Sequence, residues 1–402
     1  MARSKRHALL WAAFFLLLVG FVLHVRQMFY MSAAAAMLWP ISLLLGRHKL
    51  TGLEVSRLAP KALHGGESAE VKLRLTNPTR TKRLFVQLTD ALPAKAAGQD
   101  PSFIIPNLEA GAGVELSYVL HTGLRGVYRL GPLLLEASET LGLSTFTRKF
   151  AQSDEVIVYP APVSLPPLWP PDATGRRPRR ALRMVGADGL DFYGIREYVP
   201  GDDLRRVHWK TTARMDELMT IQFTKEQSLE GTIILDLYAK AHAGRGLFST
   251  LEQGVLLAAS AARQAETLGG DVGLIAVGEA DYSVPVALGV DQYGAILEGL
   301  ARAELTPADN WPEAVVERLV TRPPRCAALV ISPRTDETAV GLARQLLARD
   351  QVVSWMLLQP AAAAAPTLVA QLQSLGCRIR TINCSLPLQA QLGIGQRFYA
   401  QT

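Results

Sequence analysis

Two long apolar runs stand almost back to back at the start of the chain, and they restrict its fold more than any other feature. Ala8–Val25 and Met28–Leu45 each hold 18 nearly uncharged residues, and only Arg26 and Gln27 separate them. As a helix, each run would extend about 27 Å, close to the ~30 Å hydrocarbon core of a bilayer. We therefore predict a transmembrane hairpin over residues 1–49, with spans at about 8–25 and 28–45.

Two alternatives compete with the hairpin. Basic residues precede the first run, as in a signal peptide, but no A-x-A cleavage site follows before Arg26. Cleavage would also leave the second run without a role. A buried core helix is possible for either run alone, but two such runs ahead of any polar domain favour the hairpin.

The basic residues around the runs indicate an orientation. Arg26 alone lies between the runs, and the others lie at the outer ends: Arg3, Lys5, Arg6, Arg47 and Lys49. By the positive-inside rule both ends face the cytoplasm. We expect a protein of the inner (plasma) membrane with two spans and cytoplasmic soluble domains.

Positive charge is concentrated in two segments. Residues 1–49 carry +6 and residues 173–187 carry +5, so the rest of a chain whose net charge is +6 carries −5. A basic nucleic-acid-binding domain is not indicated, and we expect no nucleic acid partner. The three cysteines form no C-x-x-C pair, which favours free thiols in a reducing compartment.

The remaining chain divides by pattern. Residues 50–160 alternate apolar and polar side chains in short runs, which predicts an all-β sandwich domain. These runs are Ala69–Thr76, Arg83–Leu88, Val114–His121, Gly126–Leu130 and Leu133–Ala137. Residues 161–185 are rich in Pro and Arg and predict a basic linker. Its arginines allow three interpretations: a solvated linker, contact with anionic lipid, or contact with nucleic acid.

Residues 231–402 alternate nearly continuous apolar strands with amphipathic helices, which predicts a doubly wound α/β sheet. The expected strands include Gly231–Leu237, Asp271–Val277, Cys326–Ile331, Val352–Leu358 and Arg378–Ile382, and the expected helices include Leu247–Leu268, Glu337–Ala348 and Pro366–Leu375.

Residues 186–230 combine charged side chains, aromatic side chains and a Pro-Gly turn in an order that resembles the domain of unknown function 58 family. The matching residues are Gly189, Asp191, Phe192, Arg196, Tyr198, Pro200, Gly201, Asp202, Arg205, Val207, Trp209, Ala213, Arg214 and Glu226. Residues 125–132 also resemble the β domain of this family, although Glu139-Thr140-Leu141 stands where the family has Asp-Pro-Phe. The resemblance implies a bacterial membrane protein that works beside a MoxR-type AAA+ ATPase, with a von Willebrand factor A-like C-terminal domain.

This signature segment allows two interpretations. Pro200-Gly201 fits a type II turn, after which Asp202 or Asp203 would cap a helix that carries Arg205 and Trp209 four positions apart. The alternating Met219, Ile221 and Phe223 predict a strand that runs into the large sheet. In one interpretation, arginines around Trp209 form a recognition surface: Arg196, Arg205, Arg206 and Arg214. In the other, ion pairs such as Asp202–Arg205 or Arg214–Glu226 make the segment a structural plug.

The resemblance also directs attention to Asp236, at the end of the first predicted strand. In a metal-binding von Willebrand A domain this loop reads Asp-x-Ser-x-Ser, but Tyr238 and Lys240 replace both serines here, and Arg334 adds a positive charge nearby. We expect a degenerate site that binds no Mg²⁺ or Mn²⁺ usefully, and no other cofactor. Asp236 would then pair with Lys240 or with an arginine of the signature.

The sequence gives little support for a catalytic function. The sequence contains no G-x-S-x-G, no Cys-His pairing in a recognisable context and no phosphate-binding loop. Our first hypothesis is a membrane-anchored, non-catalytic scaffold or adaptor. The alternatives are a metal-dependent ligand-binding module and a hydrolase that uses Asp191, Asp202 and Asp203.

Overall fold

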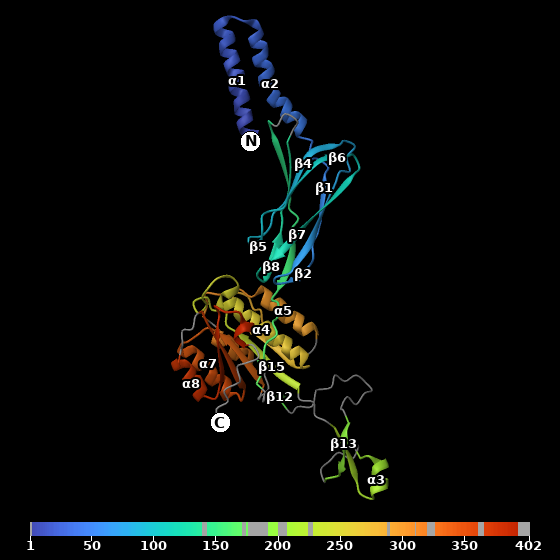
Figure 1. The fold of residues 1–402 in the computed structure, drawn as a ribbon, viewed down its shortest axis with the longest axis vertical. Coiled ribbons are helices and arrows are strands. Elements are labelled where there is room, and N and C mark those ends of the chain that lie inside the picture. Colours follow the sequence, from blue (N-terminus) through green and yellow to red (C-terminus); the bar gives the residue numbers. More distant parts are fainter. Residues whose placement is uncertain are drawn as a thin grey trace. The chain divides into compact units, whose positions relative to one another are not determined.

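The computed structural model describes residues 2–138, 143–170, 174–175, 192–199, 207–223, 228–287, 290–309, 311–319, 326–360 and 366–392 (Figure 1). The chain is a mixed α/β protein with several sheets and two apolar N-terminal helices. It divides into two compact units, residues Met1–Tyr159 and Pro160–Thr402.

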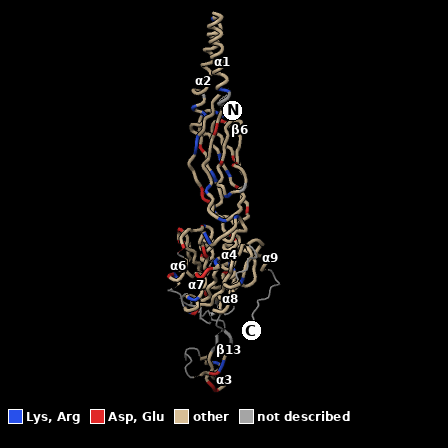
Figure 2. The backbone as a smooth tube through the Cα atoms, turned by 90° about the vertical axis from the view of Figure 1, so that its left-hand side faces the viewer, with Lys and Arg blue, Asp and Glu red and all other residues tan. Residues whose placement is uncertain are grey.

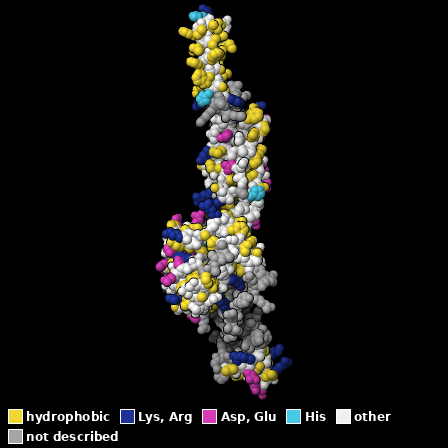
Figure 3. Space-filling model, turned by 60° about the vertical axis from the view of Figure 1, so that its left-hand side comes forward, with side chains coloured by type: hydrophobic (Ala, Val, Ile, Leu, Met, Phe, Trp, Pro, Cys, Tyr) yellow, Lys and Arg dark blue, Asp and Glu magenta, His cyan; other side chains and the backbone are white. Residues whose placement is uncertain are grey.

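The first unit starts with two antiparallel helices, α1 (Ala2–Leu23) and α2 (Arg26–Gly46). Within them, Lys5–Leu23 and Arg26–Leu44 are long and apolar enough to cross a membrane. The turn lies at His24 and Val25 rather than at Arg26 and Gln27, because His24 adopts a positive φ of 51°. Their apolar side chains face outward along most of both helices (Figure 3).

Three sheets follow in this unit. One contains β1 (Glu54–Leu58), β3 (Ser68–Thr76), β7 (Gly113–Thr122) and β5 (Ala96–Ala97), in that order. The second contains β10 (Thr145–Phe150), β9 (Leu133–Ser138), β4 (Arg83–Asp90) and β6 (Ser102–Leu108). The third contains β2 (Ala62–His64), β11 (Asp154–Tyr159) and β8 (Gly126–Leu130). The alternating side chains of β3, β4 and β9 share one apolar core, so the first two sheets pack face to face.

A buried ionic network ties the strands of this unit together. Arg57 donates to Asp90 at 2.5 Å and to Asp154 at 2.8 Å, and the Arg57 and Asp90 side chains are fully buried. Tyr118 also donates to Asp90 at 2.8 Å. Burial raises the pKa of Asp90 despite its arginine partner. Such a network holds one arrangement of the strands, because Arg57 or Asp90 without its partner would be a buried charge without compensation.

The second unit is built on a sheet with the strand order β17-β16-β15-β18-β19-β20. The strands are β15 (Ser228–Leu235), β16 (Asp271–Ala276), β17 (Val284–Ala287), β18 (Ala327–Ser332), β19 (Val352–Gln359) and β20 (Arg378–Asn383). All neighbours are parallel except β17, which is antiparallel to β16, and the short β12 (Thr174–Gly175) pairs with β15. This arrangement follows the predicted alternation of strands and helices.

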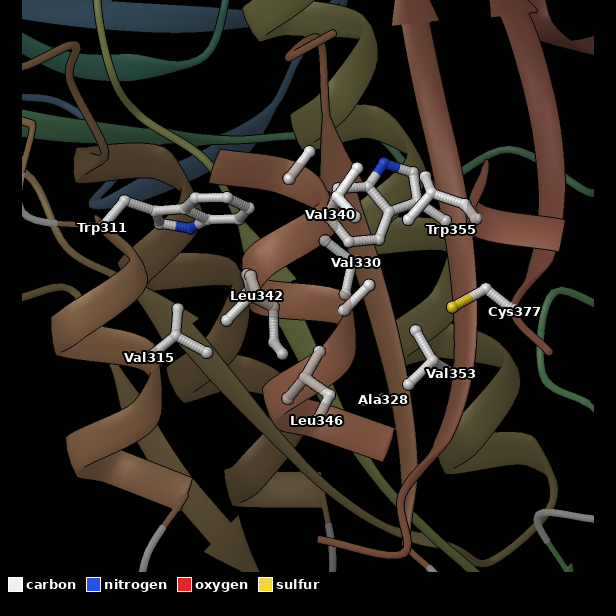
Figure 4. Close-up of a cluster of buried hydrophobic side chains, with 14 of the residues drawn as sticks. Trp311, Val315, Ala328, Val330, Val340, Leu342, Leu346, Val353, Trp355 and Cys377 are labelled. Atoms are coloured by element: carbon white, nitrogen blue, oxygen red, sulfur yellow. The ribbon is translucent and has the colours of Figure 1, made fainter. Parts of the chain in front are cut away.

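Helices cover both faces of this sheet (Figure 1). On one face lie α4 (Thr250–Thr267) and α5 (Val290–Arg302). On the other lie α6 (Trp311–Leu319), α7 (Glu337–Ala348) and α8 (Pro366–Ser374), and the short α9 (Leu388–Leu392) contacts β20. Trp311 and Trp355 meet edge to face at 6.5 Å in the core beneath α6 and α7 (Figure 4). The core on that face therefore combines this tryptophan pair with aliphatic side chains.

The first residues of the expected basic linker pack against α4. Trp169 is buried and donates its indole N–H to Ala261 O at 2.9 Å, while Leu168 N donates to Gln264 Oε1 at 2.9 Å. The indole lies against Gly231 of β15, where any Cβ would lie 2.6 Å from the ring. We call residues 163–169 the strap. Pro-rich composition predicts extended chain, but here that chain is bound to a helix. The arginines at 176–183 lie outside the described residues.

The signature segment contributes a separate two-stranded sheet, β13 (Phe192–Glu197) and β14 (Met219–Phe223), with α3 (Trp209–Met215) between them in sequence. The prediction that Met219–Phe223 runs into the large sheet is wrong, because β14 pairs with β13 instead.

Candidate functional sites

The carboxyl ends of β15 and β18 meet where the strand order reverses. β15 pairs in parallel with both β16 and β18, so the chain leaves β15 toward one side and later returns on the other. Ligands of open α/β sheets bind at this switch point. Asp236 follows β15, and Ser332 ends β18.

Asp236 is fully buried, and hydrogen-bond donors satisfy both of its carboxylate oxygens. Ser332 Oγ and Arg334 Nε each donate to Oδ2 at 2.8 Å, and the backbone N–H of Tyr238 donates to Oδ1 at 3.0 Å. The expected pairing with Lys240 or with a signature arginine is therefore wrong. Lys240 is exposed, and the guanidinium of Arg334 takes the position beside the carboxylate.

Arg334 is itself held from several directions. Its Nη2 donates to Asp309 Oδ1 at 2.6 Å, and its Cζ lies 4.6 Å from the Tyr238 ring centroid and 5.2 Å from that of Trp311. Burial alone would lower the pKa of Arg334, but the hydrogen bonds to Asp309 and Asp236 outweigh it and raise the pKa. The guanidinium is thus a permanent internal cation at the switch point.

His242 closes the other side of Asp236. Its Nε2 lies 2.8 Å from the main-chain oxygen of Asp236, and its Nδ1 lies 3.0 Å from Thr250 Oγ1 at the start of α4. Burial lowers the pKa of His242, which favours the neutral ring with the proton on Nε2. Sequence reasoning missed His242 and Thr250 as parts of this site. They reach Asp236 only because the loop after β15 folds back and places the start of α4 beside it.

These contacts make the switch point a locked ion-pair site. A divalent cation needs several oxygen ligands, and Arg334 already lies against the carboxylate that would supply the first one. Within the described ranges, no group of three or more His, Cys, Asp or Glu residues is placed to hold a metal. The side chains present fit an internal arginine, not a divalent cation.

The signature residues are placed only in part. Arg196 lies on β13, where its Nη1 donates to Glu197 O at 2.9 Å, and Tyr198 N donates to Leu218 O at 2.8 Å. Arg214 lies in the last turn of α3 and is exposed. The other predicted residues lie outside the described part of the chain: Asp191, Pro200, Gly201, Asp202, Arg205 and Glu226.

The helix of the signature differs from the expected one. Val207 forms an isolated bridge with Thr220, and His208 caps α3 by accepting from Thr211 N at 3.2 Å. The described helix α3 begins at Trp209, and His208 provides its cap. The residues expected to cap and extend a helix here, Asp202, Asp203 and Arg205, lie outside the described residues.

Exposed apolar side chains distinguish this part of the molecule. Trp209 is 67% exposed, and no residue of α3 is buried. We define the signature surface as the exposed side chains of Val199, Trp209, Met215 and Leu218. In Figure 3, yellow apolar atoms lie among blue and magenta charged atoms in the part that Figure 1 labels α3. A structural plug would bury its tryptophan, so this exposure favours a recognition surface.

Fold and site together define a mixed α/β protein with two apolar N-terminal helices, a switch point occupied by Arg334 and an exposed signature surface. Residues 194–372 match the family described as "Protein of unknown function DUF58". The matched region covers Arg196, Trp209, Asp236 and Arg334.

Relatives and solved structures add little to this assignment. The "Uncharacterized protein YeaD" of Bacillus subtilis (strain 168) is 24% identical over 279 residues, which make up 66% of this chain and 66% of that protein. A native alpha-2-macroglobulin fragment from Escherichia coli aligns with 28% of this chain and 17% of that chain, at 13% identity and a TM-score of 0.23. The CARDB domain of PF1109 from Pyrococcus furiosus aligns with 27% and 95%, at 12% identity and a TM-score of 0.19. At such scores the two structures carry no argument.

Proposed function

We propose that the protein is a membrane-anchored, cytoplasmic, non-catalytic scaffold or adaptor that works with a MoxR-type AAA+ ATPase. The observation that carries the proposal is the exposure of Trp209 within the most distinctive motif of the chain. Tryptophan and arginine commonly anchor protein interfaces, and α3 carries Trp209 and Arg214 on an unburied helix. In this proposal, α3 and the β13–β14 sheet present the signature surface to the ATPase.

The large sheet supports a von Willebrand A-like arrangement for the second unit. In its strand order the first strand, β15, lies between β16 and β18, and β17 is antiparallel at the edge. Asp236 stands at the end of β15, where such a domain would place its first metal ligand. Arg334 disfavours the alternative of a metal-dependent ligand-binding module, since it satisfies that carboxylate with an internal cation.

The absence of catalysis is part of this proposal. Asp236 accepts hydrogen bonds at both carboxylate oxygens, from Ser332, Arg334 and the Tyr238 backbone, and both ring nitrogens of His242 have partners, so neither the carboxylate nor the imidazole is left open as a base or nucleophile would be. The hydrolase alternative depends on Asp191, Asp202 and Asp203, which lie outside the described residues. The basic residues at both ends of the hairpin support the cytoplasmic location.

The partnership is tested by binding of the detergent-solubilised full chain to a purified MoxR-type AAA+ ATPase from the same cells, with and without ATP. We expect Trp209→Ala to weaken binding about 30-fold or more, equivalent to ~2 kcal/mol for an interface anchor. Leu268→Ala is the matched control, because Leu268 is 60% exposed but lies at the end of α4. Equal binding by wild type and Trp209→Ala would contradict the role of the signature surface, and absence of binding by wild type would contradict the partnership.

A further inference from the structure

We call the three sheets of the first unit the β unit. The end of the β unit that contacts α2 carries an exposed loop with both basic and apolar side chains. The β3–β4 turn and the start of β4, residues 77–85, contain Arg80, Lys82 and Arg83 followed by Leu84 and Phe85. Phe85 is 64% exposed and Leu84 is 37% exposed. Neither contributes to the apolar core of this unit, so both side chains are available to another surface.

Phe85 is held in an unusual backbone conformation. Its φ is +52°, a value that bulky residues rarely adopt. It falls between the Leu84–Asn107 and Val86–Ile105 pairs, opposite Pro106, which has no N–H to donate to β4. A strained, exposed aromatic residue is a reason to look for function.

Strand register places Phe85 at the level where α2 ends. A Cβ on Gly46 would overlap the ring of Phe146, so the last turn of α2 lies directly on β10. Phe146 pairs with Ala137 of β9, and Ala137 pairs with Val86 of β4. Phe85 therefore lies one residue beyond the row that α2 touches. Two strand spacings, about 10 Å, separate β10 from β4.

Polar contacts fix this end of the unit to the hairpin. Ser42 Oγ donates to Ser144 Oγ at 3.2 Å, and Lys49 Nζ donates to Ser138 O at 2.9 Å. Arg83 Nη2 donates to Thr51 O at 3.0 Å, which ties the turn to the chain that leaves α2. Asn77 shapes the turn by donating to Thr81 O, Leu108 O and Glu109 O. The turn thus cannot move far from the end of the hairpin.

The charges at this end suit an anionic surface. The basic side chains are Arg47, Lys49, Arg80, Lys82 and Arg83, and no acid occurs at residues 43–53 or 77–89. Nearby acids on the described strands include Glu54, Glu109 and Glu136; Asn107 donates to Glu109, and Glu136 lies opposite Gln87. Blue Lys and Arg segments lie along the backbone near the end of α2 (Figure 2). Lys and Arg beside a membrane span attract anionic lipid headgroups, and aromatic rings partition into the interface.

We propose that residues 80–85 form a membrane-surface contact, with Arg80 and Lys82 on anionic lipid headgroups and Phe85 inserted among the lipid chains near the interface. The contact rests on the membrane anchor of the proposed function, and it would hold the β unit against the bilayer. The end of the second span and the β3–β4 turn would then reach the same leaflet.

The test uses spin labels on the full chain in lipid nanodiscs of phosphatidylcholine with phosphatidylglycerol. Phe85→Cys, Val119→Cys and Phe21→Cys are each labelled, and collision with oxygen is compared with collision with a water-soluble nickel complex. Val119 is the matched control, because it is 53% exposed on the same unit but pairs with Glu70 at the opposite end of the strands. Cys326, Cys377 and Cys384 are buried, and wild type taken through the same labelling reaction corrects for any label on them.

We expect oxygen to be favoured at positions 21 and 85 and the nickel complex at position 119. Arg80→Gln with Lys82→Gln should shift position 85 toward the value at 119, as should nanodiscs of phosphatidylcholine alone, whereas Lys72→Gln should not. If the collision values at position 85 match those at position 119 while position 21 lies in lipid, the proposed contact is overturned. The membrane anchor would remain supported in that case. Water at position 21 as well refutes the anchor itself. Unchanged values in the charge variants refute the headgroup contact.

Discussion

Arg334 balances two carboxylates, Asp236 and Asp309, at the end of the central strands. Single residues of this kind decide what a site can do. With the guanidinium between Tyr238 and Trp311, the switch point is filled by a side chain of the protein itself. The site therefore holds the loops that carry Asp236 and Asp309 in one arrangement, which fits a structural rather than a catalytic role.

Removal of this internal cation should be costly. Arg334→Ala leaves Asp236 buried without its charged partner, so we expect the free energy of unfolding to fall by about 3–5 kcal/mol. Arg334→Ala combined with Asp236→Asn should recover part of the loss. Arg302→Ala is the control, since it breaks an exposed i,i+4 pair with Glu298 worth about 0.3–0.5 kcal/mol. Chemical denaturation measures all three, and an Arg334→Ala variant as stable as Arg302→Ala would contradict the lock.

At the scale of elements, the strap and α3 each carry a tryptophan, and the two side chains differ in burial. Trp169 is buried against α4 and β15, whereas Trp209 is exposed on a helix with no buried residue. Buried aromatic surface stabilises the fold, and exposed aromatic surface is available to a partner. The two side chains lie in the same compact unit, so they form a natural pair for comparison.

This contrast predicts different stability effects for the same substitution. Trp169→Ala should destabilise by about 3–5 kcal/mol, as for a buried aromatic residue. Trp209→Ala should stay within about 0.5 kcal/mol of wild type, as for an exposed site. Gly231→Ala should also destabilise, because its Cβ would press on the Trp169 ring. Thermal denaturation distinguishes the cases. Similar losses of stability in Trp169→Ala and Trp209→Ala would indicate that the signature segment is a structural plug.

Local pattern predicted the elements, and long-range contacts decided the sites. The alternation in Ser68–Thr76 and the apolar run in Ala327–Ser332 were enough to predict β3 and β18, because each pattern reflects burial on one or both faces. Pro-rich composition could not reveal that Trp169 lies on α4. Neither could spacing show that Arg334, almost 100 residues away, would be the partner of Asp236.

At the scale of the whole molecule, the two apolar helices connect the fold to its location. Their length and composition allow membrane spans, and the basic residues at both ends support cytoplasmic domains. The proposed ATPase partnership needs this orientation, whereas the proposed lipid contact at Phe85 needs only the membrane anchor.

Reporter fusions test the orientation. Alkaline phosphatase fused after Thr402 should be inactive, because it folds only outside the cytoplasm, while a fluorescent protein at the same position should be bright. An active phosphatase with a dark fluorescent protein would place the domains on the other side of the membrane.

The central claim is that Trp209 faces a partner. Photo-crosslinking in native membranes tests it most directly, with benzoylphenylalanine in place of Trp209 and, as the control, in place of Leu268. The account predicts an adduct with the MoxR-type ATPase at position 209 and none at position 268. Adducts from position 209 only to the protein's own chain, or equal adducts from both positions, would contradict it.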